Sequence, residues 1–196
     1  MENTTWNAAK TVITKLSDEM ILIERYYSND KLKYKATLNE MPGELRSKTD
    51  GTQITPRDYA TICGSKHGLA SWWYENGQKL QDINYKNGRQ DGRQTRWFED
   101  GQTRFKGNYK DEKRDGRQTW WYNNGRMRKE AYYKDGELNG AWTLWFDNGQ
   151  MKTEGHRKDD RLDGKVITWF KDGRIKSEKH YKKGVFHVRA IDGMGK

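Results

Sequence analysis

Five units of 24 residues follow one another between Gly68 and Gly184, and this strict period constrains the fold more than any other feature. Each unit opens on a glycine, carries a tryptophan–aromatic pair five residues later, and continues into an Asn-Gly or Asp-Gly dipeptide. The opening glycines are Gly68, Gly92, Gly116, Gly140 and Gly164. A fixed period of this size is typical of repeat architectures, in which each unit buries its apolar side against the next one.

The Asn-Gly and Asp-Gly dipeptides predict a β-hairpin in each unit, because strand-forming residues flank them and both turn residues tolerate a positive φ. The turn glycines are Gly77, Gly101, Gly125, Gly149 and Gly173. In the third unit we expect an incoming strand over 118–122 and an outgoing strand over 127–133. Two strands and two turns leave no room for a helix, so the units form an antiparallel meander.

The tryptophans are expected to hold the hairpins together, since a lone hairpin is marginally stable in water. One tryptophan recurs in every unit and is predicted to be structural: Trp73, Trp97, Trp121, Trp145 and Trp169. Only 32% of the residues are hydrophobic and 34% are charged, which suits a thin aromatic spine better than one large core. We therefore expect an all-β fold, an elongated, solenoid-like array of stacked antiparallel β-hairpins.

The pattern Gly-x4-Trp-Tyr/Phe-x-Asn/Asp-Gly-x7-Tyr-x2-Gly-x3-Gly resembles the MORN-repeat variant family, and the resemblance extends from Gly68 to about His187. The chain departs from the pattern at Arg157, Glu112 and Asp160. The resemblance implies arrays of stacked β-hairpins and no shared catalytic motif. It also implies an interaction role, because many bacterial members are described as antitoxin components of toxin–antitoxin pairs.

The rest of the chain falls into segments of other character. The expected organisation is an N-terminal segment with a diverged first hairpin at 1–38, an irregular segment at 39–67, the five repeats at 68–187, and a C-terminal cap and tail at 188–196. Residues 6–16 have the spacing of a short helix, and 20–27 and 31–38 that of paired strands. A last strand is expected over 185–191. The irregular segment is either a decayed repeat or an inserted loop that carries function.

No grouping of residues predicts catalysis or a metal site. Ser, His, Asp and Cys nowhere have the arrangement of a nucleophilic triad, and a single Cys63 with four scattered histidines lacks zinc-ligand spacing. We expect no enzyme and no cofactor. Without a secretory leader or an apolar run of about 20 residues, a cytoplasmic location is the default expectation.

The formal net charge of +10 lies almost entirely after residue 67. One lysine recurs just after the position of the closing tyrosine, and we call this set the lysine row: Lys86, Lys110, Lys134, Lys158 and Lys182. Such a basic face, interleaved with aromatic residues, could bind nucleic acid or another polyanion. The alternative is a row of lysines that are only solvated.

One surface breaks the internal repeat where the neighbouring positions keep it. Its bulky members are Trp72, Arg96, Trp120 and Trp142, and Trp and Arg dominate binding hot spots. We predict that a protein partner docks on these four residues, with imperfect packing as the alternative explanation. The sequence thus favours a non-enzymatic protein that neutralises or scaffolds a protein partner. Polyanion binding by the lysine row is the first alternative, and a structural or assembly role is the second.

Overall fold

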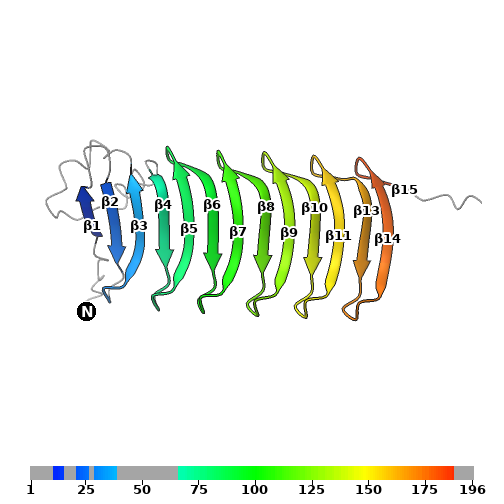
Figure 1. Ribbon diagram of the computed structural model, residues 1–196, viewed down its shortest axis with the longest axis horizontal. Coiled ribbons are helices and arrows are strands. Elements are labelled where there is room, and N and C mark those ends of the chain that lie inside the picture. The colour runs from blue at the N-terminus through cyan, green and yellow to red at the C-terminus, as the bar shows by residue number, and fades with distance from the viewer. Residues whose placement is uncertain (1–10, 16–20, 27–28, 39–65, 188–196) are drawn as a thin grey trace, which may run out of the picture. The chain divides into compact units, whose positions relative to one another are not determined.

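Every element in the part of the chain that the structure describes is a β-strand. The structure is a computed structural model, which describes residues 11–15, 21–26, 29–38 and 66–187 (Figure 1). These residues divide into two compact units. Unit 1 comprises the residues up to Thr103 together with Tyr109–Glu112, and unit 2 comprises Arg104–Asn108 and the residues from Lys113 onward.

Unit 1 is an antiparallel meander in which each strand is hydrogen-bonded to the next one along the chain. Its strands are β1 (Thr11–Lys15), β2 (Ile21–Tyr26), β3 (Leu32–Leu38), β4 (Lys66–Trp73), β5 (Lys79–Lys86) and β6 (Arg89–Trp97). Strand β7 (Thr103–Lys110) follows, and its residues are divided between the two units.

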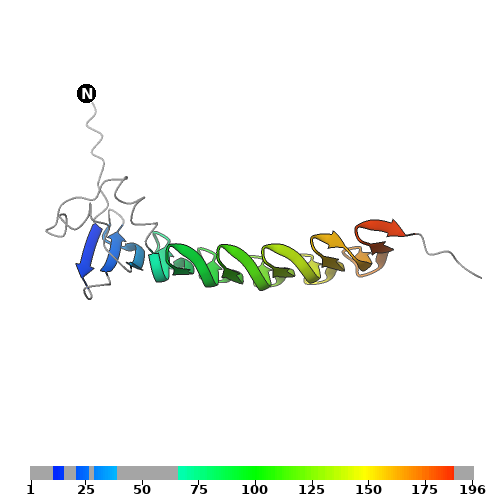
Figure 2. The same cartoon turned by 90° about the horizontal axis from the view of Figure 1, so that it is seen from above.

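Unit 2 is likewise an antiparallel meander. Its strands are β8 (Lys113–Trp121), β9 (Met127–Lys134), β10 (Glu137–Trp145), β11 (Met151–Lys158), β12 (Arg161–Leu162), β13 (Gly164–Trp169), β14 (Ile175–Lys182) and β15 (Val185–His187). The short β12 pairs only with β11. Viewed along the strands in Figure 2, the successive hairpins of this unit have the same orientation, as a strict sequence period requires. The all-β array of stacked antiparallel hairpins is therefore confirmed.

The pairing register repeats from hairpin to hairpin. In four hairpins the opening glycine lies opposite the position of the closing tyrosine, at Gly68–Tyr85, Gly116–Tyr133, Gly140–Arg157 and Gly164–Tyr181. In the same four hairpins the register shifts by a bulge immediately before the recurring tryptophan. A bulge increases the local twist, so each hairpin bends at its tryptophan.

The N-terminal strands correct one prediction and confirm another. The helix expected over 6–16 is wrong where the structure describes it, because 11–15 form β1; this stretch is rich in β-branched residues, which favour strands. Residues 6–10 lie outside the described part. The expected first hairpin is confirmed as β2 and β3.

The ends of the repeat region differ slightly from the expected bounds. Strand β4 begins at Lys66, two residues before Gly68, and the rest of the irregular segment, 39–65, lies outside the described residues. The last strand begins at Val185 as expected, while 188–196 also lie outside them.

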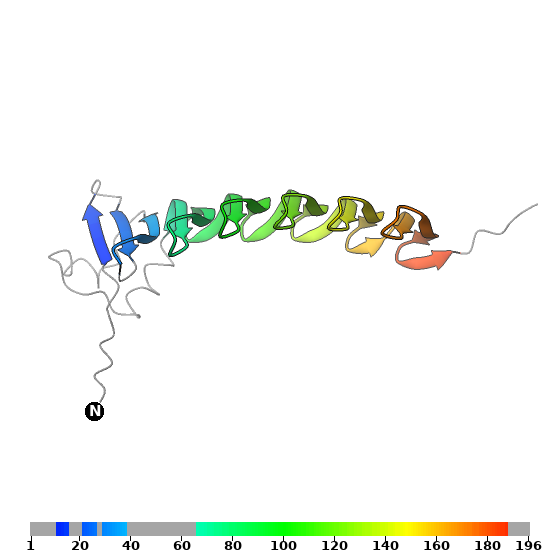
Figure 3. The ribbon, with the colours of Figure 1, turned by 90° about the horizontal axis from the view of Figure 1, so that it is seen from below.

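The hairpin turns differ from the expected two-residue type. In the first repeat the Gly77 N–H donates to the Tyr74 carbonyl (3.0 Å), and the Tyr74 N–H donates to the Gln78 carbonyl (2.8 Å). Only the glycine of the Asn76-Gly77 pair has a positive φ, of 89°. These two hydrogen bonds enclose a three-residue loop, Glu75 to Gly77, whose last residue is the glycine in the left-handed conformation. We call the end of the sheet with these turns the turn end, which Figure 3 views from below.

The opposite end of the strands has the two-residue loops, and we call it the loop end. Here both loop residues have positive φ, at Asn87-Gly88, Asp111-Glu112, Asp135-Gly136, Asp159-Asp160 and Lys183-Gly184. The two departures from the repeat pattern, Glu112 and Asp160, thus keep the backbone conformation that glycine has elsewhere, with φ of 68° and 59°. They change the loop chemistry and not its path.

One face of the sheet carries the buried apolar side chains, and we call it the core face. In unit 1 its central column is Ala36, Ala70, Ile83 and Gln94, which lie opposite one another across β3 to β6. In unit 2 the corresponding column contains Gln118 and Ala131, both fully buried. The other face is also partly covered, since Ser71, Thr95 and Thr119 are buried on it. Both faces are therefore partly buried, as the paired aromatic residues suggested.

Candidate interaction surface

Side chains at the turn end tie each turn to the next one. Tyrosine hydroxyls donate to tryptophan carbonyls one repeat further on, from Tyr74 to Trp97 (3.0 Å) and from Tyr122 to Trp145 (2.8 Å). The side-chain amides of turn asparagines also donate to backbone carbonyls one repeat further on. These bonds run from Asn76 to Glu99 (2.9 Å), from Asn124 to Asp147 (2.8 Å) and from Asn148 to Lys171 (3.1 Å). These bonds fix the spacing of the turns within a unit, so side chains placed there are held in order.

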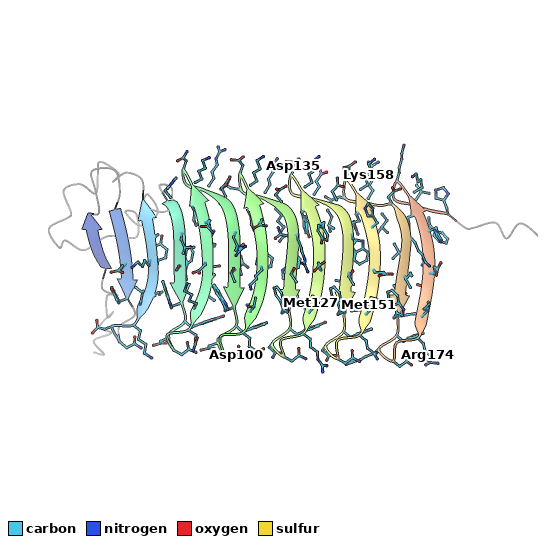
Figure 4. The ribbon with its side chains drawn as sticks, in the orientation of Figure 1. Asp100, Met127, Asp135, Met151, Lys158 and Arg174 are labelled. Carbon is cyan, nitrogen blue, oxygen red and sulfur yellow. The ribbon has the colours of Figure 1, made fainter. Side chains whose placement is uncertain are left out.

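The lysine row lies at the loop end, where Lys158 and Asp135 are visible in Figure 4. In unit 1, Lys86 and Lys110 border a hollow of about 450 Å³ together with Arg89, Asp91 and Asp111. The equivalent hollow in unit 2, of about 530 Å³, is bordered by residues that include Lys158 and Lys182.

Carboxylates are interleaved with these lysines. Asp163 lies 3.6 Å from the Lys182 ammonium group, and it accepts the backbone N–H of Lys183 at 3.3 Å. That backbone hydrogen bond, followed by the charge of Lys182, lowers the pKa of Asp163 below its ordinary value. The loop end is therefore a surface of mixed charge and not a uniformly basic one.

The four residues predicted to bind a partner all lie on the core face. Trp72 belongs to unit 1 and is half-buried, with its ring 5.1 Å from that of Tyr34 and 5.1 Å from the Lys66 ammonium group. Arg96, also in unit 1, is exposed.

Trp120 and Trp142 belong to unit 2 and are half-buried. The Trp120 ring lies 5.1 Å from that of Phe105, and the Trp142 ring lies over Gly155. The structure thus gives the three tryptophans packing contacts, whereas the role of all four residues in binding stays a prediction.

The last three of the five recurring tryptophans, in contrast, lie beside exposed apolar side chains at the turn end. Trp73, Trp97, Trp121, Trp145 and Trp169 are all half-buried. Met127, Met151 and Ile175 lie opposite the last three of them across each hairpin, and we call these three residues the apolar row. They are 38%, 39% and 59% exposed, and Figure 4 shows Met127 and Met151 at the turn end. Unit 2 therefore exposes an ordered apolar surface.

The same position is polar in unit 1. Lys79 lies opposite Trp73, and its ammonium group is 6.0 Å from the Trp73 ring and 5.7 Å from the Trp97 ring. It also forms an ion pair with Asp82 at 2.8 Å. The sequence carried this signal, since the residue two places after each turn glycine changes from Lys79 to methionine and isoleucine. The change is easily overlooked, because the recurring aromatic pair precedes the turn whereas this position follows it.

Other kinds of site are not found in the part of the chain that the structure describes. No three His, Cys, Asp or Glu side chains there come together as metal ligands. None of its residues belongs to a helix with the length and apolar character needed to span a membrane. The surfaces that can be described are thus the loop end, the core face and the apolar row.

A meander of antiparallel hairpins that share one register, one bulge position and one recurring tryptophan position every 24 residues defines a β-hairpin repeat protein. The model of the MORN repeat variant matches residues 66–87, 90–111, 114–135, 138–159 and 162–183, which together cover more than half of the chain. The chain belongs to the MORN repeat family, a class of non-catalytic repeats associated with binding to proteins or membranes.

Further comparisons add little. The curated proteins contain no match to the chain. Among solved structures, the crystal structure of the GtfA/B complex bound to UDP and GlcNAc is similar at 18% identity and a TM-score of 0.23. The match covers 56% of this chain and 22% of that chain, and at this TM-score it carries no argument about function.

Proposed function

We propose that the chain is a non-enzymatic cytoplasmic protein that binds a protein partner through unit 2 and neutralises or scaffolds it, as an antitoxin or inhibitor does. The observation that carries the proposal is the apolar row, whose three members are exposed beside three half-buried tryptophans. A row of apolar side chains held in order on one surface is the kind of feature that marks an interaction site.

The geometry around the apolar row supports this proposal. The hydrogen bonds from Tyr122 and Asn124 to the next repeat hold the turns in place, so that a partner would meet an already ordered surface. Preorganisation of this kind reduces the entropy lost on binding. Methionine side chains also adapt their shape to a partner at little cost.

The first alternative is polyanion binding at the loop end. The repeated hollows beside Lys86 and Lys158 favour it, whereas Asp91, Asp111 and Asp163 in the same places weaken it. The second alternative, an assembly role, is favoured by the edge strand β15, where Val185 and Phe186 are 62% and 49% exposed.

Binding measurements with variants distinguish these functions. The chain is used to capture proteins from extracts of its native host, and the captured protein is then purified and titrated. We expect saturable binding that Met127→Asp and Met151→Asp weaken by about 30-fold or more, the scale of an interface hot spot. Lys79→Glu changes the same turn position in unit 1 and serves as the control. Binding to nucleic acid that falls steeply with salt, with no protein captured, would support the first alternative instead.

A further inference from the structure

The core-face column nearest the turn end changes from bulky to small side chains along unit 2. Its bulky members include Phe105 and Trp120, whose rings lie 5.1 Å apart. Two repeats later the same positions are Thr153 and Thr168, which lie opposite each other across β11 and β13. The next position in the column is Ser177, whose hydroxyl is 2.6 Å from that of Thr168.

A cavity of about 400 Å³, open to solvent, lies where these small side chains replace the tilted pair of rings. Its apolar walls are Phe146, Trp169 and Phe170, and the two threonines and three lysines complete the lining. Phe146 holds the position of Tyr122 in the repeat before. It therefore has no hydroxyl with which to repeat the bond from Tyr122 to the next tryptophan carbonyl.

Cationic groups surround this cavity. The ammonium groups of Lys152 and Lys176 each lie 5.6 Å from a ring centroid, those of Phe146 and Phe170 respectively. Within the described residues no carboxylate lies within ion-pair distance of either group. The third lysine of the lining, Lys171, is paired with Asp147 at 2.7 Å. Two positive charges are thus left beside an apolar cavity.

Resting on the function proposed above, we propose that this cavity takes an apolar side chain from an acidic segment of the protein partner. The aromatic walls provide the apolar contact, and Lys152 and Lys176 bind carboxylates that flank the inserted side chain. Opposite charges placed around an apolar centre are the usual anatomy of a protein interface.

The chemistry of the lining favours such a segment over a polar ligand. Inside the cavity the hydrogen-bonding groups are threonine hydroxyls, and that of Thr168 is already paired with Ser177. Phe170 is 45% exposed and extends the apolar surface beyond the cavity, so that a chain crossing it gains contact on both sides.

The chain itself supplies the variant that fills the cavity. Thr153→Phe with Thr168→Trp restores the pair that Phe105 and Trp120 form at the same positions, so the fold is known to accept it. Thr168→Leu is a milder second variant, because Leu144 holds this position in the repeat before. Lys152→Glu with Lys176→Glu reverses the charges, and Lys134→Glu at the loop end is the matched control.

The experiment measures binding of a fluorescein-labelled acidic peptide, with one central leucine flanked by glutamates, to the full chain by fluorescence anisotropy. We expect saturable binding that falls at least about tenfold in either cavity-filling variant and in the charge-reversed one, which is the loss of one anchoring contact. The control variant binds normally, and a peptide with serine in place of leucine does not bind. Thermal melts establish that each variant is folded.

Three results would overturn the proposal: no binding of the acidic peptide, equal binding by the filled variants, or binding of vesicles of phosphatidylserine instead of the peptide. Binding of the captured protein partner to the same variants shows whether only the cavity proposal fails or the proposed function fails as well. If the filled variants still bind that partner as tightly as the natural chain, only the cavity proposal falls. If the natural chain captures no protein, the proposed function falls with it.

Discussion

Trp142 lies over Gly155, the residue opposite it across β10 and β11. A Cβ atom built on Gly155 would be 3.0 Å from Cγ2 of Val166 and 3.1 Å from both Cζ2 and Nε1 of the indole, so both neighbours would have to move by a few tenths of an ångström. The pair shows how the central column of the core face is filled, with a bulky side chain on one strand and a small one on the next. In unit 1 the column is filled the other way round, with Ala70 opposite Ile83.

Because the two residues are packed against each other, substitutions at Trp142 and Gly155 should have coupled effects on stability. Gly155→Ile should lower the free energy of unfolding by about 1–3 kcal/mol, because it overpacks the site under Trp142. Adding Trp142→Ala recreates the pairing of Ala70 with Ile83, so the double variant should recover part of the loss. Urea unfolding of the two single variants and the double one measures this coupling. Losses that simply add would contradict the packing described here.

The bond from Tyr122 to the Trp145 carbonyl predicts a second effect. Tyr122→Phe removes the hydroxyl and should cost about 0.5–1.5 kcal/mol, the net contribution of one hydrogen bond. Tyr132→Phe is the control, because Tyr132 is 39% exposed and its hydroxyl makes no hydrogen bond within the described residues. The comparison is made by chemical denaturation, and equal stabilities of the two variants would count against a bond between repeats.

Acidification should weaken the loop end. The backbone N–H of Lys183, followed by the charge of Lys182, lowers the pKa of Asp163 in the folded chain. A carboxylate with a lowered pKa stabilises the fold above its unfolded pKa, and this contribution disappears as the pH falls through the folded value. The melting temperature should therefore decrease once the pH is below about 4, which is the ordinary pKa range of carboxylates. Asp163→Asn should make this fall shallower; an unchanged slope would exclude a contribution from Asp163.

The two adjacent tryptophans of the third repeat should be similarly important for stability. If Trp120 serves binding, as the sequence analysis predicts, Trp121→Ala would cost about 3–5 kcal/mol and Trp120→Ala much less. Both side chains are half-buried, and Trp120 also stacks on Phe105 and lies 4.9 Å from the Lys129 ammonium group. We now expect losses within about 1 kcal/mol of each other, the scale of one aromatic pair. A denaturant melt in which Trp120→Ala is nearly neutral would restore the original expectation.

Much of the fold could be predicted because its information is periodic and local. The Asn-Gly and Asp-Gly dipeptides and the 24-residue spacing were enough to place every hairpin of the repeats. The helix expected over 6–16 is wrong for 11–15, the part of it that the structure describes, because the β-branched residues there favour a strand more strongly than the apolar spacing favours a helix. Both the turn type and the bulge before each tryptophan depend on pairing across strands, which a count along the chain does not show.

The candidate site was harder to predict because it depends on which residues meet across strands. Trp142 is recognisable in the sequence because it breaks the repeat. Its small partner Gly155 is 13 residues further on, and only the pairing of β10 with β11 brings the two together. Similarly, Thr153 and Thr168 attract no notice as residue types, and only their register opposite each other produces the cavity.

The central claim is that unit 2 binds a protein through its apolar row. It is tested most directly by isothermal titration of the purified partner, captured from the native host, into the natural chain and into Met127→Asp/Met151→Asp/Ile175→Asp. We expect stoichiometric, saturable binding by the natural chain and a loss of at least about 100-fold in the triple variant, while Lys79→Glu binds normally. Equal affinities of the natural chain and the triple variant, both folded by thermal melt, would contradict it.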